Sequence, residues 1–404
     1  MTAGPCISGS PRVVLSNFGS AGDINPLIAL ASRLKAHGYR PVLAASAKFR
    51  DRIEREHIGF AAIGPDLPEI IRGVGSTERE AASAENDFAF VLKTMVMPHI
   101  EQSFADAMEA IADAALVIAG PLAFGARLAA IKHRVPWLSL SLQPTVFLPS
   151  WWRTAENYLG PEQELRIRLG LSRHSGDRSW DGIFSPLGTI ALYSPLLPTD
   201  DVELPPRTEA VGFAFYDRTP SGQDGLSASL NRFLESGPPP LVFTAGSWLA
   251  PSARAFFQHG AMAARALKRR AVLLTGVHRE GTMLADGVFA CPYTPFSHLL
   301  SRVEAVVHHG GIGTLAQALS AGRPQLVVPF GFDQYDNAER LVRLGVARQL
   351  SATRYTAQTA AEQLNELLSA NSYKERATDL ARLIREEDGA GKVLRIVDEV
   401  LQAR

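Results

Sequence analysis

The chain has 404 residues, 46% of them hydrophobic and 20% charged, and this length and globular composition predict two domains rather than one core. Its 41 basic and 41 acidic residues cancel, which argues against a nucleic-acid partner because such proteins usually carry a basic excess. Only Cys6 and Cys291 are present, no signal peptide is evident and no apolar run approaches the ~20 residues that span a bilayer, so we expect a cytoplasmic protein without a transmembrane segment.

The first half of the chain alternates apolar strands with helical segments. Its first helix shows apolar residues at helical spacing, with Pro26 in the first turn and Gly38 after the end. The order of strand, helix and strand is typical of a doubly wound α/β domain, which we place at residues 1–215. The elements expected here are strands at 12–18, 39–45, 116–119, 137–140 and 190–193, and helices at 27–34 and 123–132.

Two segments of this half break the alternation. Residues 64–84 are rich in glycine, proline and charge, which predicts a mobile loop of the kind that often faces a substrate. Residues 148–185 are expected to be irregular and contain the adjacent Trp151 and Trp152. These rings either wall a pocket for an apolar acceptor or pack a long insertion onto the domain surface. A peripheral membrane contact is less favoured, because no basic face accompanies them.

A second α/β series follows a segment of linker composition. We assign residues 216–240 to the linker and the first helix of the second domain, and residues 241–388 to the rest of that domain. Residues 389–404 show one apolar stripe, which predicts a helix that must be covered. The elements expected here are strands at 241–244 and 271–275, a helix at 253–268, and the stripe of Val393, Ile396, Val397, Val400 and Leu401.

The residues with the clearest chemical meaning lie between 305 and 337. An apolar strand ends in His308 and His309, a glycine turn leads into a helix at 315–321 that stops at Gly322, and a strand follows at 325–329. Such a unit leaves a helix N-terminus beside the ends of strands, where free N–H groups and the helix dipole attract phosphate. A metal site is the alternative for two histidines. Adjacent residues of a strand point to opposite faces, so His308 and His309 are poorly placed to bind one ion together, and a phosphate site is favoured over a metal site.

H-H-G-G-I-G-T at 308–314, followed by P-F-G-F-D-Q-Y-D-N at 329–337, resembles the donor signature of the family 1 nucleotide-sugar glycosyltransferases. The likeness is to bacterial rhamnosyltransferases of glycolipid assembly, sterol glucosyltransferases and antibiotic glycosyltransferases. It implies the GT-B architecture, in which two Rossmann-like domains face a central cleft, with the acceptor in the first and the nucleotide sugar in the second. It also implies that the final helix crosses back to the first domain; docking on the second domain is the alternative.

The resemblance assigns a set of residues to the donor diphosphate. His309 would donate a hydrogen bond and the following helix start would add N–H groups and a hydroxyl, whereas Ser247 taken alone is more often a turn cap. Plant relatives carry Asn where Gly313 stands, so one side-chain donor is missing here. The residues assigned to the diphosphate are Ser247, His309, Gly311, Gly313 and Thr314.

The resemblance also assigns the sugar and the base. Asp333 and Gln334 would bind sugar hydroxyls, with a helix cap as the alternative for Asp333. Tyr293, with Phe296 second, would stack on the base; the alternative is an aromatic buried under the loop. Plant relatives have Trp at the position of Tyr293, which leaves uracil and thymine both open.

Asp23, in G-S-A-G-D-I-N-P, resembles the aspartate of the G-x-x-G-D-x-x-P motif in bacterial relatives and is the expected general base. A carboxylate with an ordinary pKa near ~3.9 is a weak base, but partial burial would strengthen it. The alternative is a helix N-cap ahead of Pro26.

These residues together predict a hexosyltransferase that needs no metal and no cofactor, and the resemblance implies inversion at the anomeric carbon. Its donor would be a UDP- or dTDP-sugar, with glucose or rhamnose foremost, and its acceptor a hydroxyl of a small apolar glycolipid, sterol, polyketide or flavonoid-like compound. The protein would act as a monomer or a homodimer. The alternatives are a nucleotide-sugar epimerase of the same fold, which the Asp333–Gln334 pair argues against, and a catalytically silent nucleotide-sugar-binding partner.

Overall fold

A computed structural model of the chain describes residues 9–66, 87–172, 183–218, 225–246, 250, 253–276 and 281–403. Ser247 and most of the loop expected at 64–84 lie outside the described residues, as does the side chain of Trp152. No helix within the described ranges is both long and apolar enough to cross a membrane.

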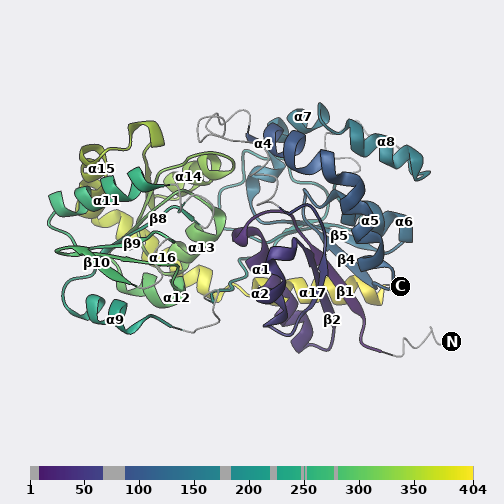
Figure 1. Ribbon diagram of the computed structural model, residues 1–404, viewed down its shortest axis with the longest axis horizontal. Helices are drawn as coiled ribbons and strands as arrows, with labels where there is room; N and C mark the ends of the chain where they lie inside the picture. Colours follow the sequence, from purple (N-terminus) through teal and green to yellow (C-terminus); the bar gives the residue numbers. More distant parts are fainter. Residues whose placement is uncertain are drawn as a thin grey trace.

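The first sheet lies in the purple and blue half of Figure 1. Within the described residues it has seven strands in the order β3-β2-β1-β4-β5-β6-β7, and every pair is parallel. The central strand, Leu116–Ala119, is apolar and buried on both faces, as is typical of parallel sheets. The strands are β1 (Arg12–Ser16), β2 (Arg40–Ala45), β3 (Gly59–Ala62), β4 (Leu116–Ala119), β5 (Trp137–Ser141), β6 (Thr189–Ala191) and β7 (Thr208–Ala210).

Helices connect these strands and cover the sheet. The first begins at Ala21, earlier than expected, because Ser20 is the N-cap and Pro26 therefore lies inside the helix rather than in its first turn. The helices are α1 (Ala21–Ala36), α2 (Arg50–Glu54), α4 (Asp87–Phe90), α5 (Ile100–Ile111), α6 (Phe124–His133), α7 (Pro149–Glu156) and α8 (Gly160–Arg168). Between them lie a π-helix, η2 (Val91–Val96), and the short 3₁₀ turns η1 (Ala47–Phe49), η3 (Met97–His99) and η4 (Pro144–Phe147).

One expectation for this domain was wrong, and one strand was missed. Residues 148–185 are not irregular throughout, since α7 and α8 begin with Pro149 and Pro161 in their first turns, where a missing N–H costs no helical hydrogen bond. β7 was not expected. It follows the proline-rich residues 195–206 and pairs with β6 at the sheet edge, where a short strand needs no apolar run.

The second sheet repeats the design in the green half of Figure 1. Its order in the described chain is β10-β11-β9-β8-β12-β13-β14, and only β10 runs antiparallel to its neighbour there. The strands are β8 (Leu241–Thr244), β9 (Ala271–Leu274), β10 (Thr282–Ala285), β11 (Val288–Cys291), β12 (Ala305–His308), β13 (Gln325–Val327) and β14 (Ala347–Gln349). The helices are α9 (Ala228–Glu235), α11 (Arg254–Ala266), α12 (Phe296–Leu299), α13 (Ile312–Ser320), α14 (Gln334–Arg343), α15 (Ala357–Ser369) and α16 (Asn371–Glu386), with turns η5 (Leu300–Arg302) and η6 (Ala352–Arg354).

The last helix, α17 (Gly389–Gln402), returns to the first domain. It packs on α1 and appears in yellow beneath the purple strands of Figure 1. Val393 and Val397 are buried in this contact, and the Tyr39 hydroxyl donates a hydrogen bond to Asp398. The expected crossing is confirmed, and docking on the second domain is wrong. The two domains also meet through α1 and α13, so the loops that precede these two helices face one cleft.

Candidate active site

The loop after β1 holds Asp23 through a capping box at the start of α1. Oδ2 of Asp23 accepts hydrogen bonds from the backbone N–H of Ser20 at 2.7 Å and from its hydroxyl at 3.1 Å. Gly19 has φ +144°, and a Cβ there would lie 2.2 Å from Oδ2, so the loop requires glycine at this position. In the described chain, no hydrogen bond is made by Oδ1. Asp23 is therefore not the N-cap of α1, yet its carboxylate has one fixed oxygen and one available oxygen.

The surroundings of Asp23 make it a stronger base than an exposed aspartate. Burial raises the pKa of its carboxyl, while the hydrogen bonds from Ser20 and the positive charge of Lys48 lower it less. Because the net pKa is raised, a proton that arrives from an acceptor hydroxyl is held more tightly than on an ordinary aspartate.

The glycine turn after β12 opens the N-terminus of α13. The helix begins at Ile312, three residues earlier than expected, and its N-cap is Gly311, which has no side chain to satisfy the first N–H groups. An added Cβ on Gly313 would meet nothing within 4 Å, so open space lies beside the first turn. Thr314 is in that turn but is largely buried. These features are those of an anion site at a helix N-terminus.

The two histidines that end β12 have separate surroundings. Their ring centroids are 6.4 Å apart and the ring planes are nearly perpendicular. His308 is fully buried, where Nδ1 accepts from the Gly310 N–H at 3.0 Å and Nε2 lies 2.8 Å from the Gln325 side-chain oxygen. Since an oxygen only accepts, Nε2 of His308 carries the proton. His308 is therefore occupied in holding the turn.

The His309 ring lies between two glycines. An added Cβ would lie 2.5 Å from Cε1 at Gly246 and 2.4 Å from Nε2 at Gly311, so neither position tolerates a side chain while the ring is there. Nδ1 of His309 is buried without a hydrogen-bond partner in the described chain. Burial, with the neighbouring His308, lowers the pKa of His309 to about 3, so the ring is neutral near pH 7 and has one N–H to donate.

Asp333 lies at the start of α14, at the end of the turn that follows β13. It occupies the N-cap position, but its side chain makes no capping hydrogen bond, so the alternative of a helix cap is wrong. Phe332 before it has φ +57°, a strained conformation for a residue with a side chain. This turn aims the Asp333 carboxylate at Asn337 instead.

Asn337 is a site residue that the sequence analysis missed. Its Nδ2 donates to Oδ2 of Asp333 at 2.6 Å and to the Gly310 carbonyl at 3.0 Å, and the residue is 1% exposed. One amide therefore fixes both the carboxylate and the glycine turn. The available signal was the spacing of four residues between Asp333 and Asn337, which places them on one helix face.

Gln334 has less freedom than expected. Its side-chain oxygen accepts from the N–H groups of Phe330 at 2.8 Å and Gly331 at 3.3 Å. Only the NH₂ end remains for a ligand, so Gln334 could offer a donor but no acceptor.

Asp23 and Asp333 come from different domains and influence each other electrostatically. Burial and the negative charge of Asp23 raise the pKa of Asp333 to about 7. The cleft thus brings one carboxylate from each domain beside the open end of α13.

Tyr293 and Phe296 lie where the linker passes the second domain. Their ring centroids are 5.7 Å apart with an interplanar angle of 59°. The Tyr293 hydroxyl donates to Asp217, which also accepts from the Ser297 N–H at 2.6 Å. Burial and Asp217 raise the pKa of Tyr293 far above its usual value. Asp217 of the linker therefore fixes the Tyr293 ring through the tyrosine hydroxyl. Stacking of this ring on a nucleotide base stays a prediction.

A cavity in the first domain opens at the carboxyl ends of β1, β2 and β4. Its walls are mostly apolar. Asn17, in its wall, donates to the Asp23 carbonyl at 3.3 Å. Trp151 is not in the wall; it stacks on Phe88 with ring centroids 4.3 Å apart. Large side chains in the wall are Phe18, Phe49, Ile63, Val96, Ile100, Leu122 and Phe124.

Two protein-family models match the chain. Residues 13–138 match the glycosyltransferase family 28 N-terminal domain, and this range contains Asp23. Residues 271–394 match the erythromycin biosynthesis protein CIII-like C-terminal domain, which contains His309 and Asp333.

Curated relatives align with almost the whole chain. O-mycaminosyltylonolide 6-deoxyallosyltransferase of Streptomyces fradiae is 27% identical, over 97% of this chain and 98% of its own. Glycosyltransferase GtfC of Amycolatopsis orientalis is 30% identical, over 96% and 97%. Sterol 3-beta-glucosyltransferase UGT80A2 of Arabidopsis thaliana is 25% identical, over 95% of this chain and 64% of its own.

Solved structures share the fold. Spinosyn rhamnosyltransferase SpnG complexed with thymidine diphosphate has a TM-score of 0.74 at 18% identity, over 96% of this chain and all of its own. The glycosyltransferase of kitacinnamycin has a TM-score of 0.73 at 20% identity, over 97% and 99%. With a relative at 30% identity over nearly its full length, the chain belongs to the family 1 glycosyltransferases of the GT-B fold and is an enzyme that uses a nucleotide sugar.

Proposed function

We propose that this enzyme transfers a hexose from a UDP- or dTDP-sugar to a hydroxyl of a small apolar acceptor, with inversion at the anomeric carbon and without a metal. The observation that carries the proposal is the contact between α1, which carries Asp23, and α13, whose N-terminus is open. Asp333 from the second domain lies near enough for the charge of Asp23 to raise its pKa. One cleft then holds a base, Asp23, a carboxylate that binds sugar hydroxyls, Asp333, and an anion site at the start of α13.

In this mechanism the acceptor lies in the apolar cavity of the first domain, with its hydroxyl at Asp23. Oδ1 of Asp23 takes the hydroxyl proton as the oxygen forms a bond to the anomeric carbon and the bond to the diphosphate breaks. Ser20 keeps Oδ2 in place during the transfer. Attack from the first domain on a sugar whose leaving group lies in the second domain supports inversion.

The leaving diphosphate gains negative charge as its bond to the sugar breaks. The first N–H groups of α13 and the N–H of neutral His309 would stabilise this charge. These donors are already in place before the reaction, so they do not have to reorient as the charge develops. Asp333 would hold the sugar hydroxyls, and Asn337 would keep Asp333 in register with the glycine turn. These groups do the work that a divalent ion does in other transferases.

The chemistry of the substrates follows from the cavity and from the relatives. The apolar wall favours a hydrophobic acceptor with few polar groups. Sterol and antibiotic glycosyltransferases among the relatives support an acceptor of that kind, and a neighbour complexed with thymidine diphosphate supports dTDP beside UDP as the nucleotide.

The test is a matrix of donors and acceptors followed by mass spectrometry. UDP-glucose, dTDP-glucose and dTDP-rhamnose are each incubated with sterol, flavonoid, macrolide and hydroxylated lipid acceptors. We expect a hexose or deoxyhexose adduct with at least one pair, and an inverted anomeric configuration by NMR. A change of the donor alone, seen without any acceptor, would favour the epimerase alternative. Donor binding without any product in the matrix would favour a silent binding protein.

A further inference from the structure

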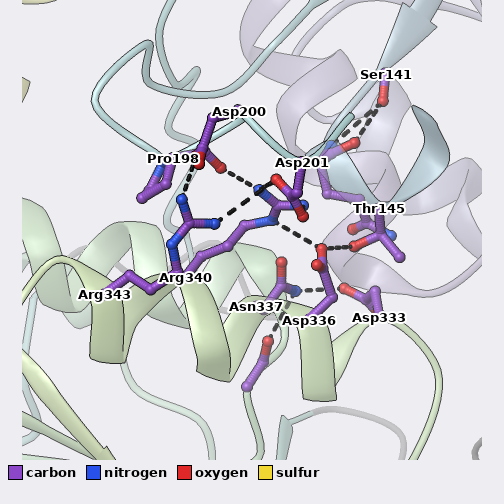
Figure 2. Close-up of polar contacts among 12 residues, drawn as sticks. Ser141, Thr145, Pro198, Asp200, Asp201, Asp333, Asp336, Asn337, Arg340 and Arg343 are labelled. Atoms are coloured by element: carbon purple, nitrogen blue, oxygen red, sulfur yellow. Dashed lines mark hydrogen bonds and ion pairs between the residues drawn. The ribbon is translucent and has the colours of Figure 1, made fainter. Parts of the chain in front are cut away.

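The helix α14 presents a different set of side chains to each domain. Asp333 and Asn337, four residues apart, face the glycine turn of their own domain. Asp336 and Arg340, also four residues apart, face the first domain, as Figure 2 shows. Residues on one helix move together. Contacts that Asp336 and Arg340 make with the first domain therefore also fix the position of Asp333.

Arg340 is the centre of the contact with the first domain. It is 1% exposed, and its two terminal nitrogens donate to the two carboxylate oxygens of Asp201 at 2.8 and 2.9 Å. Its Nε donates to Asp336 at 2.9 Å, and it also donates to the Pro198 carbonyl. The fork geometry of the Asp201 pair fixes direction as well as distance.

Asp336 extends the network to a second segment of the first domain. Its Oδ2 accepts from the hydroxyl of Thr145 at 2.5 Å, and Thr145 lies in the turn that follows β5. The helix is therefore held at 145 and at 198–201, two places far apart in the sequence that belong to the same domain (Figure 2).

An ion pair whose arginine is buried is a weak source of stability, since apolar side chains of similar volume often serve a static interface equally well. What charges and forked hydrogen bonds add is one defined geometry. Here the geometry that they define is the placement of α14, and hence of Asp333, relative to the domain that carries Asp23.

We propose that Arg340 is a positioning residue that, through Asp201, Asp336 and Thr145, sets the separation between Asp333 and the base Asp23 when the cleft is closed. The inference builds on the proposed roles of Asp23 and Asp333. Loss of the Arg340 contacts lets α14 and its domain rotate away, so the sugar is bound but no longer in line with the acceptor oxygen. Misplacement by about 1 Å is enough to slow such a reaction by roughly 100-fold.

The test uses Arg340→Met, which retains much of the volume and removes the donors. Its matched control is Arg343→Met, one turn further along α14. This exposed arginine pairs with exposed Asp200 and lies 3.7 Å from a carboxylate oxygen of Asp201, without the fork that Arg340 makes there. For Arg340→Met we expect kcat to fall about 10- to 100-fold, with the affinity for UDP or dTDP alone within about twofold of wild type because the glycine turn is untouched. For Arg343→Met we expect kcat and affinity within about twofold of wild type, as is usual for exposed pairs.

A distance measurement makes the test independent of turnover. Spin labels at Glu109→Cys in α5 and Gln358→Cys in α15, both exposed, report the separation of the domains in a Cys6→Ser background, since Cys291 is buried. We expect a longer or broader distance distribution in Arg340→Met and an unchanged one in Arg343→Met. If wild type transfers no sugar in any assay, the proposed function fails, and this measurement still decides the inference.

Thr145→Val provides a second route if Arg340→Met does not fold. It removes one hydroxyl, is nearly isosteric, and leaves both ion pairs of Arg340. We expect kcat to fall several-fold with nucleoside diphosphate affinity unchanged, and Arg340→Lys, which keeps the charge without the fork, to fall between wild type and Arg340→Met. The inference is overturned if the variants that fold keep wild-type kcat and wild-type distances, or if kcat and UDP affinity fall together with the melting temperature.

Discussion

Asp23 at the start of α1 and Asp333 at the start of α14 form a pair of acidic groups across the cleft. Asp333 is partly buried, and burial together with the charge of Asp23 raises its pKa to about 7. Two carboxylates that lie close together cannot both ionise easily, so the proton affinity of one depends on the charge of the other. The pair links the domain that holds the acceptor to the domain that holds the sugar.

This pair predicts how donor binding depends on pH. Above about pH 7 Asp333 is ionised and accepts hydrogen bonds from sugar hydroxyls; as pH falls through about 7 it binds a proton and accepts fewer. We therefore expect the affinity for the nucleotide sugar to fall below about pH 7, as measured by calorimetric titration across this range. In Asp23→Asn the neighbouring charge is gone, so the midpoint should move to lower pH. An unchanged midpoint would show that Asp23 does not act on Asp333.

The same pKa predicts an effect on stability. The folded protein holds the Asp333 proton more tightly than the unfolded chain, in which its pKa is near 3.8. The contribution of Asp333 to the free energy of unfolding is therefore fully present below about pH 4 and declines as pH rises to about 7. We expect Asp333→Asn to melt at a higher temperature than wild type at pH 8, with the difference shrinking toward pH 4. If the melting temperatures of Asp333→Asn and wild type differ equally at pH 8 and pH 4, the effect does not come from titration of the Asp333 carboxyl.

His309→Ala should weaken the binding of the nucleoside diphosphate. The neutral ring offers one N–H beside the α13 N-terminus, and loss of a hydrogen bond to a charged group costs about 1–3 kcal/mol. Titration of UDP and dTDP into wild type and variant measures the loss. His309→Gln keeps a neutral N–H donor and should recover part of the affinity. Equal binding by wild type and His309→Ala would show that this ring does not touch the diphosphate.

Asp333→Ala and Asn337→Ala should separate recognition of the sugar from recognition of the diphosphate. Asp333→Ala removes only the group placed on the sugar, so it should weaken the intact donor and leave the bare nucleoside diphosphate almost unaffected. Asn337→Ala also releases the Gly310 carbonyl, so it should weaken both ligands. Comparison of their dissociation constants for UDP-glucose and UDP tests this. An equal loss of both ligands in Asp333→Ala would make its role structural.

Transfer should proceed without a divalent cation. The proposed anion site consists of helix N–H groups and His309, and His308 is turned away from it to hold the turn. We expect turnover to be the same within error in excess EDTA and in magnesium or manganese. If EDTA abolishes activity and a metal restores it, a metal ion and not the helix N–H groups with His309 stabilises the leaving diphosphate.

The fold and the main site segments were predictable from the sequence because they depend on local patterns. Apolar runs, glycine turns and helix stops are local, and the donor signature placed His309 and Asp333 in the second domain. The bonds made by Asn337 and Arg340 were not predictable, because they depend on which helix face meets which loop 27 to 142 residues away. Gln334 shows a different limit. Its oxygen accepts from Phe330 and Gly331, only four and three residues earlier, in a turn whose backbone conformation the sequence pattern does not specify.

Asp23→Asn separates the chemical role of the first loop from its structural role. Asn can still accept from the Ser20 N–H, so the capping box persists and the loss of stability should stay below about 1 kcal/mol. Removal of one of two neighbouring negative charges offsets part of that loss. The variant cannot accept the acceptor's proton, and turnover should therefore fall by roughly 10²–10⁴, with donor affinity little changed.

The matched control for that change is Ser20→Ala, which removes the N-cap hydroxyl and one bond to Asp23 while keeping the carboxylate. It should cost about 1 kcal/mol of stability and much less turnover than Asp23→Asn. The acidity of the acceptor gives a further comparison, because a phenol needs less help from a base than an aliphatic alcohol and should lose less rate in Asp23→Asn. If Asp23→Asn keeps near-normal turnover on an aliphatic alcohol, Asp23 is not the base. The His133 ring is tied to the Met108 carbonyl at 3.0 Å, so it could replace Asp23 only by breaking that contact, which leaves His99 as the first residue to test.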